Sequence, residues 1–302
     1  MDSSRPTATS PGSVAILGTG LMGAQIAAEY ALGGWSVTCL SRHPLAAEAR
    51  VEEALGLVRR ERLAAAEALH EAPARIDFRT AEDELGPCEL IVESLPEDLG
   101  LKSDVLGAVA SRQPRALIAT NTSSISIPEL AAAASVAGRI VGTHYWNPPL
   151  LMPLVEIVAA EGTPGDRLDL VEAILAGLGK RPVRLRREVP GLLWNRLQAA
   201  VLRECLWLVE QGAASPQALD EVMRDGLARR WRLTGPFETV GLGGASTFDA
   251  IARNLFPALS DAASCEGFGA YVPTEPAELR ALRERRDEAL ARLLREERGI
   301  EP

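Results

Sequence analysis

The chain has 302 residues, 47% of them apolar and 24% charged, which is a globular composition with room for two domains. Its formal net charge of −9 argues against nucleic-acid binding, because phosphate backbones need clustered lysines and arginines. Apolar stretches fall short of the roughly 20 residues that a membrane span requires, and residues 1–11 lack the apolar run of a signal peptide. We therefore expect a cytoplasmic protein with a flexible tail over residues 1–11 and with neither nucleic-acid nor membrane partners.

Short apolar runs alternate with longer helical patterns as far as residue 185. Patterns of buried strands occur at residues 14–17, 37–40, 90–92, 116–119, 140–142 and 154–158. Helical patterns lie between them, for example at residues 24–32, 44–70 and 99–111. Strands that alternate with helices predict a parallel sheet covered by helices on both faces.

Beyond residue 190 the strand patterns disappear. Three helical patterns follow, at residues 192–212, 216–226 and 276–298. The change in pattern predicts a domain boundary near residues 187–190. We therefore expect an α/β domain over residues 12–188 and an all-helical domain over residues 189–302.

Four cysteines are scattered along the chain, at Cys39, Cys88, Cys205 and Cys265. Their positions show neither the paired spacing of a zinc site nor a disulfide framework. Three of them sit in apolar strand or helix patterns, so buried free thiols in a reducing cytoplasm are expected, and no metal site.

The segment Gly18-Thr19-Gly20-Leu21-Met22-Gly23 fits the pattern G-x-G-x-x-G between a predicted strand and a predicted helix. In a dinucleotide site the first glycine permits the turn, the second admits a pyrophosphate, and the third lets helix and strand pack closely. The helix N-terminus offers N–H groups to the phosphates. The alternative is a plain tight turn. The context favours dinucleotide binding through Gly18, Gly20, Leu21, Met22 and Gly23, and a doubly wound, Rossmann-type sheet.

The second predicted strand ends in Ser41-Arg42-His43. Sites specific for NAD place a carboxylate about 20 residues after the glycine turn to bind the ribose 2′-hydroxyl, whereas an arginine there accommodates a 2′-phosphate. The sequence therefore favours NADP(H) over NAD(H), with Ser41 and Arg42 in the site. In the alternative interpretation Arg42 is a solvated loop residue and Ser41 alone holds the ribose.

Polar residues follow two of the later strands, where ligands bind in open α/β sheets. Asn121-Thr122-Ser123-Ser124 follows one strand, and Thr143-His144-Tyr145-Trp146-Asn147 ends another. Glu156 lies in the middle of an apolar strand and needs a partner, because an unpaired buried charge is costly. His144 is nearby and suits the removal of a hydroxyl proton, since a histidine titrates near neutral pH, and a carboxylate on its second nitrogen would fix the tautomer.

These segments resemble the L-3-hydroxyacyl-CoA dehydrogenase family. The shared motifs are the glycine turn, N-T-S-S, H-x-x-N-P, L-V-E and a P-G-F-x-x-N-R-like segment at Pro190-Gly191-Leu192-Leu193-Trp194-Asn195-Arg196. Within the family the likeness is strongest to the lambda-crystallin (L-gulonate 3-dehydrogenase) branch, through Pro96-Glu97-Asp98-Leu99, Pro153-Leu154-Val155-Glu156 and Gly235-Pro236-Phe237-Glu238-Thr239.

The resemblance implies roles for several residues. His144 would be the catalytic base and Glu156 its partner, and Ser123 and Asn195 would bind near the reacting oxygen. Three further residues would line the nicotinamide end of the cofactor site: Glu97, Lys102 and Asn121. The helical domain of the family implies a homodimer. The chain departs from the family at Ser41-Arg42, where an aspartate is usual, and at Trp146 and Trp194, which would narrow the pocket.

The substrate expected from the sequence is a small anionic hydroxy or keto acid. Residues 44–70 carry four arginines and five glutamates, which gives no net attraction for the phosphates of coenzyme A. Arg230 and Arg196 are candidates for binding the substrate carboxylate, although either could instead form a structural salt bridge. Two alternatives stay open: a dehydrogenase of 3-hydroxyacyl thioesters on coenzyme A or a carrier protein, and a non-catalytic, crystallin-like nucleotide-binding protein.

Overall fold

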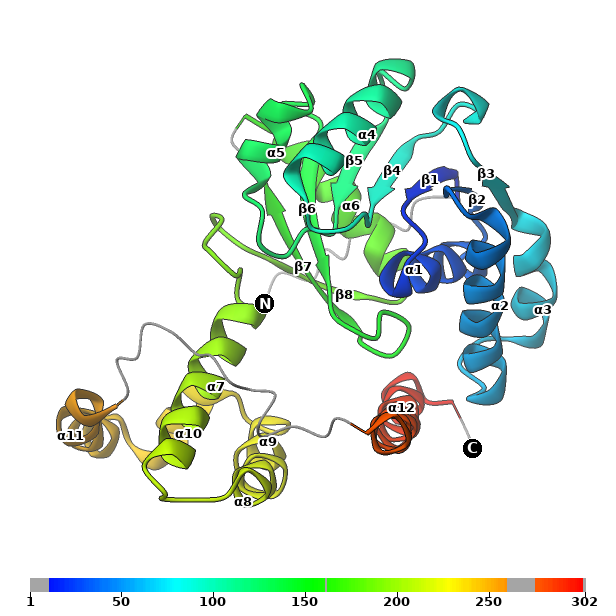
Figure 1. Cartoon of the computed structure of the whole chain (residues 1–302). Helices are drawn as coiled ribbons and strands as arrows, with labels where there is room; N and C mark the ends of the chain where they lie inside the picture. Colours follow the sequence, from blue (N-terminus) through cyan, green and yellow to red (C-terminus); the bar gives the residue numbers. More distant parts are fainter. Residues whose placement is uncertain (1–10, 161, 260–274, 301–302) are drawn as a thin grey trace. The chain divides into compact units, whose positions relative to one another are not determined.

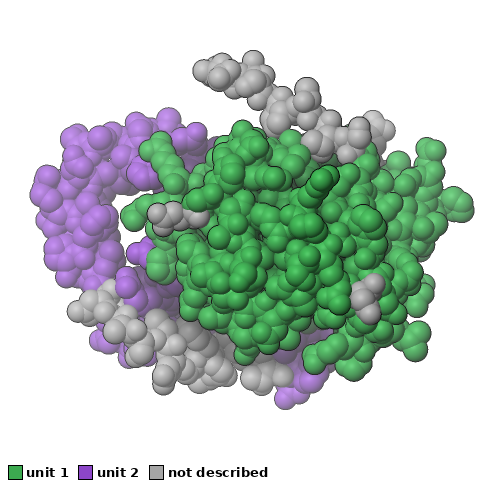
Figure 2. Space-filling view, turned by 90° about the horizontal axis from the view of Figure 1, so that it is seen from above, with its two compact units in different colours: residues 1–193, 281–302 green, residues 194–280 purple. Residues whose placement is uncertain are grey.

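The structure is a computed structural model that describes residues 11–160, 162–259 and 275–300 (Figure 1). The chain divides into two compact units, which Figure 2 shows in different colours: Met1–Leu193 with Ala281–Pro302, and Trp194–Arg280. Residues 1–10 of the predicted tail lie outside the described part of the chain. The two units are described separately below.

The first unit is built on an eight-stranded sheet with the order β3-β2-β1-β4-β5-β6-β7-β8. The strands are β1 (Ser13–Leu17), β2 (Ser36–Leu40), β3 (Ile76–Arg79), β4 (Leu90–Glu93), β5 (Leu117–Thr120), β6 (Ile140–Tyr145), β7 (Leu154–Ala159) and β8 (Arg181–Arg184). The chain leaves β1 toward β2 and β3 on one side and then crosses to β4 on the other. This is a doubly wound Rossmann-type arrangement, so the predicted fold class is confirmed.

The sheet differs from the prediction in three strands. β7 runs antiparallel to β6, whereas every other neighbouring pair is parallel. Only residues 146–153 connect β6 to β7, too few for the crossover of a dozen or more residues that parallel neighbours need. The two edge strands, β3 and β8, are four-residue segments rich in charged residues, so the apolar pattern did not reveal them.

Helices cover both faces of the sheet. They are α1 (Leu21–Leu32), α2 (Pro44–Arg60), α3 (Ala66–Glu71), α4 (Leu99–Arg112), α5 (Ile127–Ala133) and α6 (Gly165–Gly177), so the helical pattern at residues 44–70 forms two helices. Along β1 the side chains alternate between two cores. Val14 and Ile16 pack with residues of α1, α2 and α6, and Ala15 and Leu17 pack with residues of α4 and α5.

The last helix, α12 (Pro276–Arg298), has the bounds that the sequence predicted. From Ala281 onward it groups with the first unit rather than with the helical one. Ala291 and Leu294 are buried in the core that contains α1, and Arg295 donates to the carbonyl oxygen of Glu61 at 2.6 Å. Contacts between distant segments produce this grouping, which the pattern of the helix by itself does not indicate.

The second unit is helical throughout its described residues. It contains α7 (Trp194–Glu210), α8 (Pro216–Glu221), the π-helical turn η3 (Val222–Leu227), α9 (Ala228–Trp231), α10 (Pro236–Gly243), α11 (Ala245–Leu255) and the short 3₁₀ turn η4 (Phe256–Ala258). Within its described part only Leu206 and Thr239 are buried. Across the described residues of both units, no helix combines the length and apolarity needed to cross a membrane.

Candidate active site

The glycine turn joins β1 to α1, and each glycine has a different environment. Gly18 has φ +88°, and a Cβ there would lie 2.7 Å from the carbonyl oxygen of Ser94. A Cβ on Gly23 would collide with the carbonyl oxygen of Gly18, whereas a Cβ on Gly20 would meet no atom within 4 Å. Thus the first and third glycines serve close packing, and the second faces open space.

The start of α1 suits an anionic group. The capping residue before its first turn is Gly20, so no side chain caps the helix, and the first turn contains no acidic residue. Unpaired N–H groups and the positive end of the helix dipole therefore lie beside the open side of Gly20. Leu21 is exposed at this end of the helix, and Met22 is half-buried. The turn lies at the carboxyl end of β1 next to β4, where the strand order reverses, and these features fit a dinucleotide pyrophosphate.

The carboxyl end of β2 continues into Ser41, Arg42 and His43. The Ser41 hydroxyl accepts a hydrogen bond from the His43 backbone N–H at 3.3 Å, and the Ser41 N–H donates to the Arg79 carbonyl oxygen at 2.9 Å. The Arg42 side chain is exposed. No carboxylate occupies this short segment, and a guanidinium stands in its place.

His144 and Glu156 face each other across the antiparallel pair β6–β7. They are direct register partners, and His144 Nδ1 lies 2.6 Å from Glu156 Oε2. Both are buried, with exposed fractions of 4% and 1%. The antiparallel hairpin, which the sequence did not predict, is what makes these residues cross-strand neighbours.

Glu156 receives two further hydrogen bonds. The Trp146 indole N–H donates to Oε2 at 3.3 Å, and the Leu193 backbone N–H donates to Oε1 at 2.7 Å. A carboxylate oxygen beside Nδ1 favours the tautomer with the proton on that nitrogen, which leaves Nε2 as an acceptor. The backbone donor at Leu193 was not predicted, because residue types do not indicate which backbone N–H meets a distant carboxylate.

Ser123 completes a chain of three side chains. Its hydroxyl oxygen lies 3.1 Å from His144 Nε2, on the side of the ring opposite Glu156. Ser123 belongs to the loop that follows β5, and its side chain is half-buried. The predicted trio Ser123, His144 and Glu156 is therefore brought together in the first unit.

Glu97 holds the loop that carries Ser123. Its Oε1 accepts from the backbone N–H groups of Ser123, Ser124 and Ile125 and from the hydroxyls of Thr122 and Ser124, at 2.7–3.3 Å. Burial by itself would raise the pKa of Glu97, but these hydrogen bonds and the charge of Lys102 lower that pKa to about 2. Glu97 was predicted to line the nicotinamide end of the cofactor site, and this role stays a prediction; its observed contacts are with the Ser123 loop and with Lys102.

Lys102 and Asn121 are also engaged inside the protein. The Lys102 ammonium is fully buried and lies 2.6 Å from Glu93 Oε1, 3.0 Å from the Leu95 carbonyl oxygen and 3.3 Å from Glu97 Oε2. The Asn121 amide accepts from the Tyr145 N–H at 2.8 Å and donates to Ser94 Oγ at 3.3 Å. These residues fasten the loops after β4 and β5 together. Their predicted contact with a cofactor stays a prediction.

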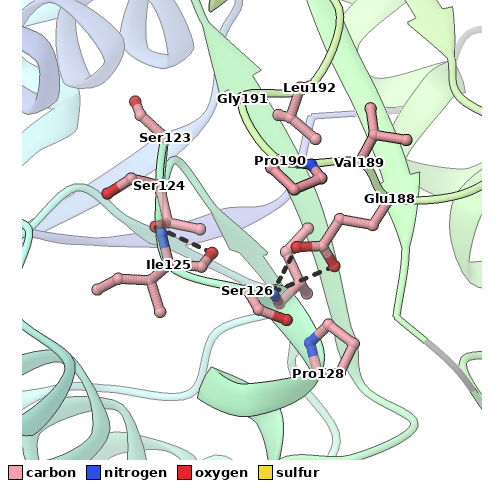
Figure 3. Close-up of a pocket in the computed structure, with 12 residues that line it drawn as sticks. Ser123, Ser124, Ile125, Ser126, Pro128, Glu188, Val189, Pro190, Gly191 and Leu192 are labelled. Carbon is pink, nitrogen blue, oxygen red and sulfur yellow. Dashed lines mark hydrogen bonds between the residues drawn. The ribbon is translucent and has the colours of Figure 1, made fainter. Parts of the chain in front are cut away.

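A cavity of about 350 Å³ adjoins Ser123. Figure 3 shows its walls, which are formed by the loop and helix start at residues 122–128 and by residues 188–192. The walls combine serine hydroxyls with apolar side chains, and the Glu188 carboxylate is fixed by accepting from the Ile127 N–H at 3.1 and 3.3 Å. The sequence analysis did not single out Glu188, whose bond to residue 127 spans 61 positions.

Three predicted substrate-binding residues belong to the second unit. Asn195 lies on α7 and is half-buried, Arg196 follows it and is exposed, and Arg230 is exposed on α9. Their roles stay predictions.

The cysteines and possible metal ligands complete the description. Cys39 is buried and Cys88 and Cys205 are half-buried, all as free thiols, while Cys265 lies outside the described residues. Within the part of the chain that the structure describes, no cluster of histidine, cysteine and acidic side chains could hold a metal ion.

The fold and the site define a dehydrogenase with a nicotinamide dinucleotide cofactor. Residues 13–189 match the family described as 3-hydroxyacyl-CoA dehydrogenase, NAD binding domain, and residues 191–272 match its C-terminal domain. The chain therefore belongs to the 3-hydroxyacyl-CoA dehydrogenase family, as its motifs indicated. This is a family of NAD-dependent enzymes that act on CH–OH groups.

Several relatives match most of the chain. Lambda-crystallin of Oryctolagus cuniculus is 30% identical over 96% of this chain and 98% of its own. An L-carnitine dehydrogenase of Pseudomonas aeruginosa is 35% identical over 77% of this chain and 73% of its own. The solved structure of 5-formyl-3-hydroxy-2-methylpyridine 4-carboxylic acid 5-dehydrogenase, an NAD+-dependent dismutase, has a TM-score of 0.86 at 26% identity and covers 96% of this chain and 99% of its own.

Proposed function

We propose that the protein interconverts a small 3-hydroxy acid and its 3-keto acid, with His144 as the base and Glu156 as its partner. The observation that carries the proposal is the continuous chain from Ser123 Oγ through His144 Nε2 and Nδ1 to Glu156 Oε2, with separations of 3.1 and 2.6 Å. Such a chain moves one proton at a defined atom, which alcohol oxidation requires.

In the oxidative direction His144 Nε2 takes the proton of the substrate hydroxyl. The imidazolium that forms is stabilised by the Glu156 carboxylate, whose geometry is fixed by Trp146 and Leu193. Ser123 binds the reacting oxygen from the other side, and we assign a second bond to Asn195. A nicotinamide dinucleotide held at the glycine turn would supply the acceptor for the hydride of the carbinol carbon.

We propose that the cofactor is NADP(H) in preference to NAD(H). Support comes from Arg42 at the end of β2, where a carboxylate for the ribose 2′-hydroxyl is missing. The family model and the NAD+-dependent dismutase support a nicotinamide dinucleotide cofactor in general. Dissociation constants for NADPH and NADH, measured side by side, test the preference for NADP(H).

The substrate we propose is a free acid of low molecular weight. Relatives act on small acids such as carnitine, and the cavity of about 350 Å³ suits a molecule of this size. Arg230 and Arg196 would bind its carboxylate as planar bidentate donors. A thioester of coenzyme A or of a carrier protein is the second candidate, favoured by the family to which the chain belongs.

We also propose that two copies associate through the helical unit, in the reducing cytoplasm. Large apolar side chains are exposed there in the single chain, including Phe237 at 90% and Leu242 at 78%, together with Ile251, Leu255 and Phe256. A stable monomer rarely exposes so many apolar groups in one region. Light scattering should give the mass of a dimer, and Phe237→Asp combined with Leu242→Asp should reduce it to that of a monomer.

The decisive experiment compares the unchanged protein with His144→Ala. With a panel of 3-hydroxy acids and both cofactors, activity should fall by about 10³-fold or more in the variant, whereas the dissociation constant for the cofactor should stay the same. Equal activity in both proteins would refute the mechanism. If the unchanged protein binds cofactor and turns over none of the free acids or thioesters, the non-catalytic, crystallin-like alternative replaces the proposal.

A further inference from the structure

Arg50 connects α2 to the glycine turn. It lies 31 residues after Thr19 in the sequence, and its Nη1 donates to the Thr19 carbonyl oxygen at 3.3 Å. Thr19 stands between the first two glycines of the turn and is buried, whereas the Arg50 side chain is exposed. The guanidinium therefore lies at the surface of the turn. Arg50 is one of the four arginines that five glutamates balance within residues 44–70.

Among the arginines of residues 44–70, Arg50 is distinguished by its hydrogen bond to the glycine turn, and it has no carboxylate partner within the part of the chain that the structure describes. Several arginines of the first unit are neutralised by carboxylates: Arg60 by Glu61, Arg75 by Glu71 and Arg79 by Asp77. Among the described residues, neither Arg50 nor Arg42 takes part in an ion pair. A guanidinium has five N–H donors, and the hydrogen bond to the Thr19 carbonyl oxygen involves only Nη1 of Arg50. The remaining donors are available to an external anion.

We propose that Arg50 binds a phosphate group of the adenine dinucleotide. The inference rests on the proposed dinucleotide function. Arg42 extends from the end of β2, and Arg50 reaches the turn from α2, which packs against α1. A guanidinium without an ion pair in the described chain, held at the turn that precedes a helix N-terminus without a side-chain cap, suits a phosphate, because arginine matches phosphate oxygens in a bidentate geometry.

Arg50 could bind either of two anionic parts of the cofactor, the 2′-phosphate or the pyrophosphate. A 2′-phosphate would lie at the end of β2, near Arg42, and the pyrophosphate would lie at the glycine turn, near Gly20. The adenosine fragments 2′,5′-ADP and 5′-ADP separate these sources, because only the first carries the 2′-phosphate. Neither fragment contains nicotinamide, so the measurement is independent of catalysis.

The test measures dissociation constants of both fragments by titration calorimetry for the unchanged protein, Arg50→Gln and a control, Arg59→Gln. Arg59 is exposed near the other end of α2. We expect Arg50→Gln to weaken binding by about tenfold to a hundredfold, and Arg59→Gln to leave it unchanged. A loss confined to 2′,5′-ADP assigns Arg50 to the 2′-phosphate, and an equal loss for both assigns it to the 5′-phosphates. Arg50→Lys, which keeps the charge and loses the bidentate geometry, should fall in between.

The outcomes separate this inference from the proposed function. If the unchanged protein binds the fragments and Arg50→Gln binds them equally well, the inference is overturned and the proposed function stands. If the unchanged protein binds neither fragment nor either whole cofactor, the proposed function fails first. Thermal unfolding of Arg50→Gln distinguishes a lost phosphate contact from a disturbed turn, because a lost contact alone leaves the melting temperature of the nucleotide-free protein close to that of Arg59→Gln.

Discussion

Two glutamates organise the two halves of the catalytic region in different ways. Glu156 is buried within the β6–β7 pair, and one of its partners, His144, is a side chain that can gain a proton. Glu97 is exposed, and Oε1 of its carboxylate accepts from three backbone N–H groups and two hydroxyls of the Ser123 loop. Both carboxylates accept from several donors, yet only one of them faces a group whose charge changes during the proposed reaction.

This difference separates electrostatic from geometric contributions. The charge of Glu156 matters more in the transition state, when the imidazole becomes cationic, than in the resting protein. The charge of Glu97 acts on donors that are the same in every state, so it fixes where Ser123 lies. Substitutions at the two positions should therefore reduce activity to different extents and in different parameters.

The largest effect is expected for Glu156→Gln. The amide keeps the shape and can still accept from His144 Nδ1, but it no longer stabilises the imidazolium, so kcat should fall by about 10²- to 10⁴-fold. KM and the dissociation constant of the cofactor should change little. Steady-state kinetics together with cofactor titration measure both quantities. A decrease of less than threefold in kcat would remove Glu156 from the mechanism.

A smaller effect is expected for Glu97→Gln. The uncharged amide oxygen is a weaker acceptor for five donors, so the loop should become less ordered and kcat/KM should fall by about tenfold to a hundredfold. Glu84→Gln is a matched control, because Glu84 Oε2 likewise accepts from the Thr80 N–H and hydroxyl and from the Ala81 N–H. The control should retain full activity. Equal losses in both variants would indicate a general effect on stability.

The sequence predicted the elements of this site better than their arrangement. The glycine turn and the pairing of His144 with Glu156 followed from local patterns, since each motif sits where a strand ends or lies buried. The antiparallel direction of β7 depends on the length of the β6–β7 connection. The edge strands β3 and β8 have no apolar pattern of their own. Contacts such as the Leu193 N–H with Glu156 involve backbone groups of distant segments, which residue types do not encode.

Trp146→Phe tests the outer part of the Glu156 environment. The substitution keeps an aromatic ring and removes the indole N–H that lies 3.3 Å from Glu156 Oε2. One hydrogen bond to a charged group contributes about 1.5 kcal/mol, so kcat should decrease by up to about tenfold. In the double variant with Glu156→Gln, the increase in activation free energy should be smaller than the sum of the increases in the two single variants, because both changes act on the same carboxylate. Additive losses would place Trp146 in an independent role, such as shaping the pocket.

The smallest effect is expected in the acid stability of the protein. The ordinary pKa of a glutamate is 4.5, and in the folded protein the pKa of Glu97 is lowered to about 2. The unfolded chain therefore binds a proton at this residue at higher pH than the folded protein does, so the stabilisation is complete above about pH 4.5 and is lost as the pH falls toward 2. Glu97→Gln lacks this proton uptake. Its free energy of unfolding, measured with urea at several pH values from 5 down to 3, should depend less steeply on pH than that of the unchanged protein. The difference in slope should correspond to at most about one proton taken up on unfolding. Glu48→Gln, an exposed change on α2, provides the control. Identical pH dependences for Glu97→Gln and the unchanged protein would mean that the Ser123 loop holds Glu97 no more tightly in its charged than in its neutral form, and the contrast between the two glutamates would then rest on Glu156 alone.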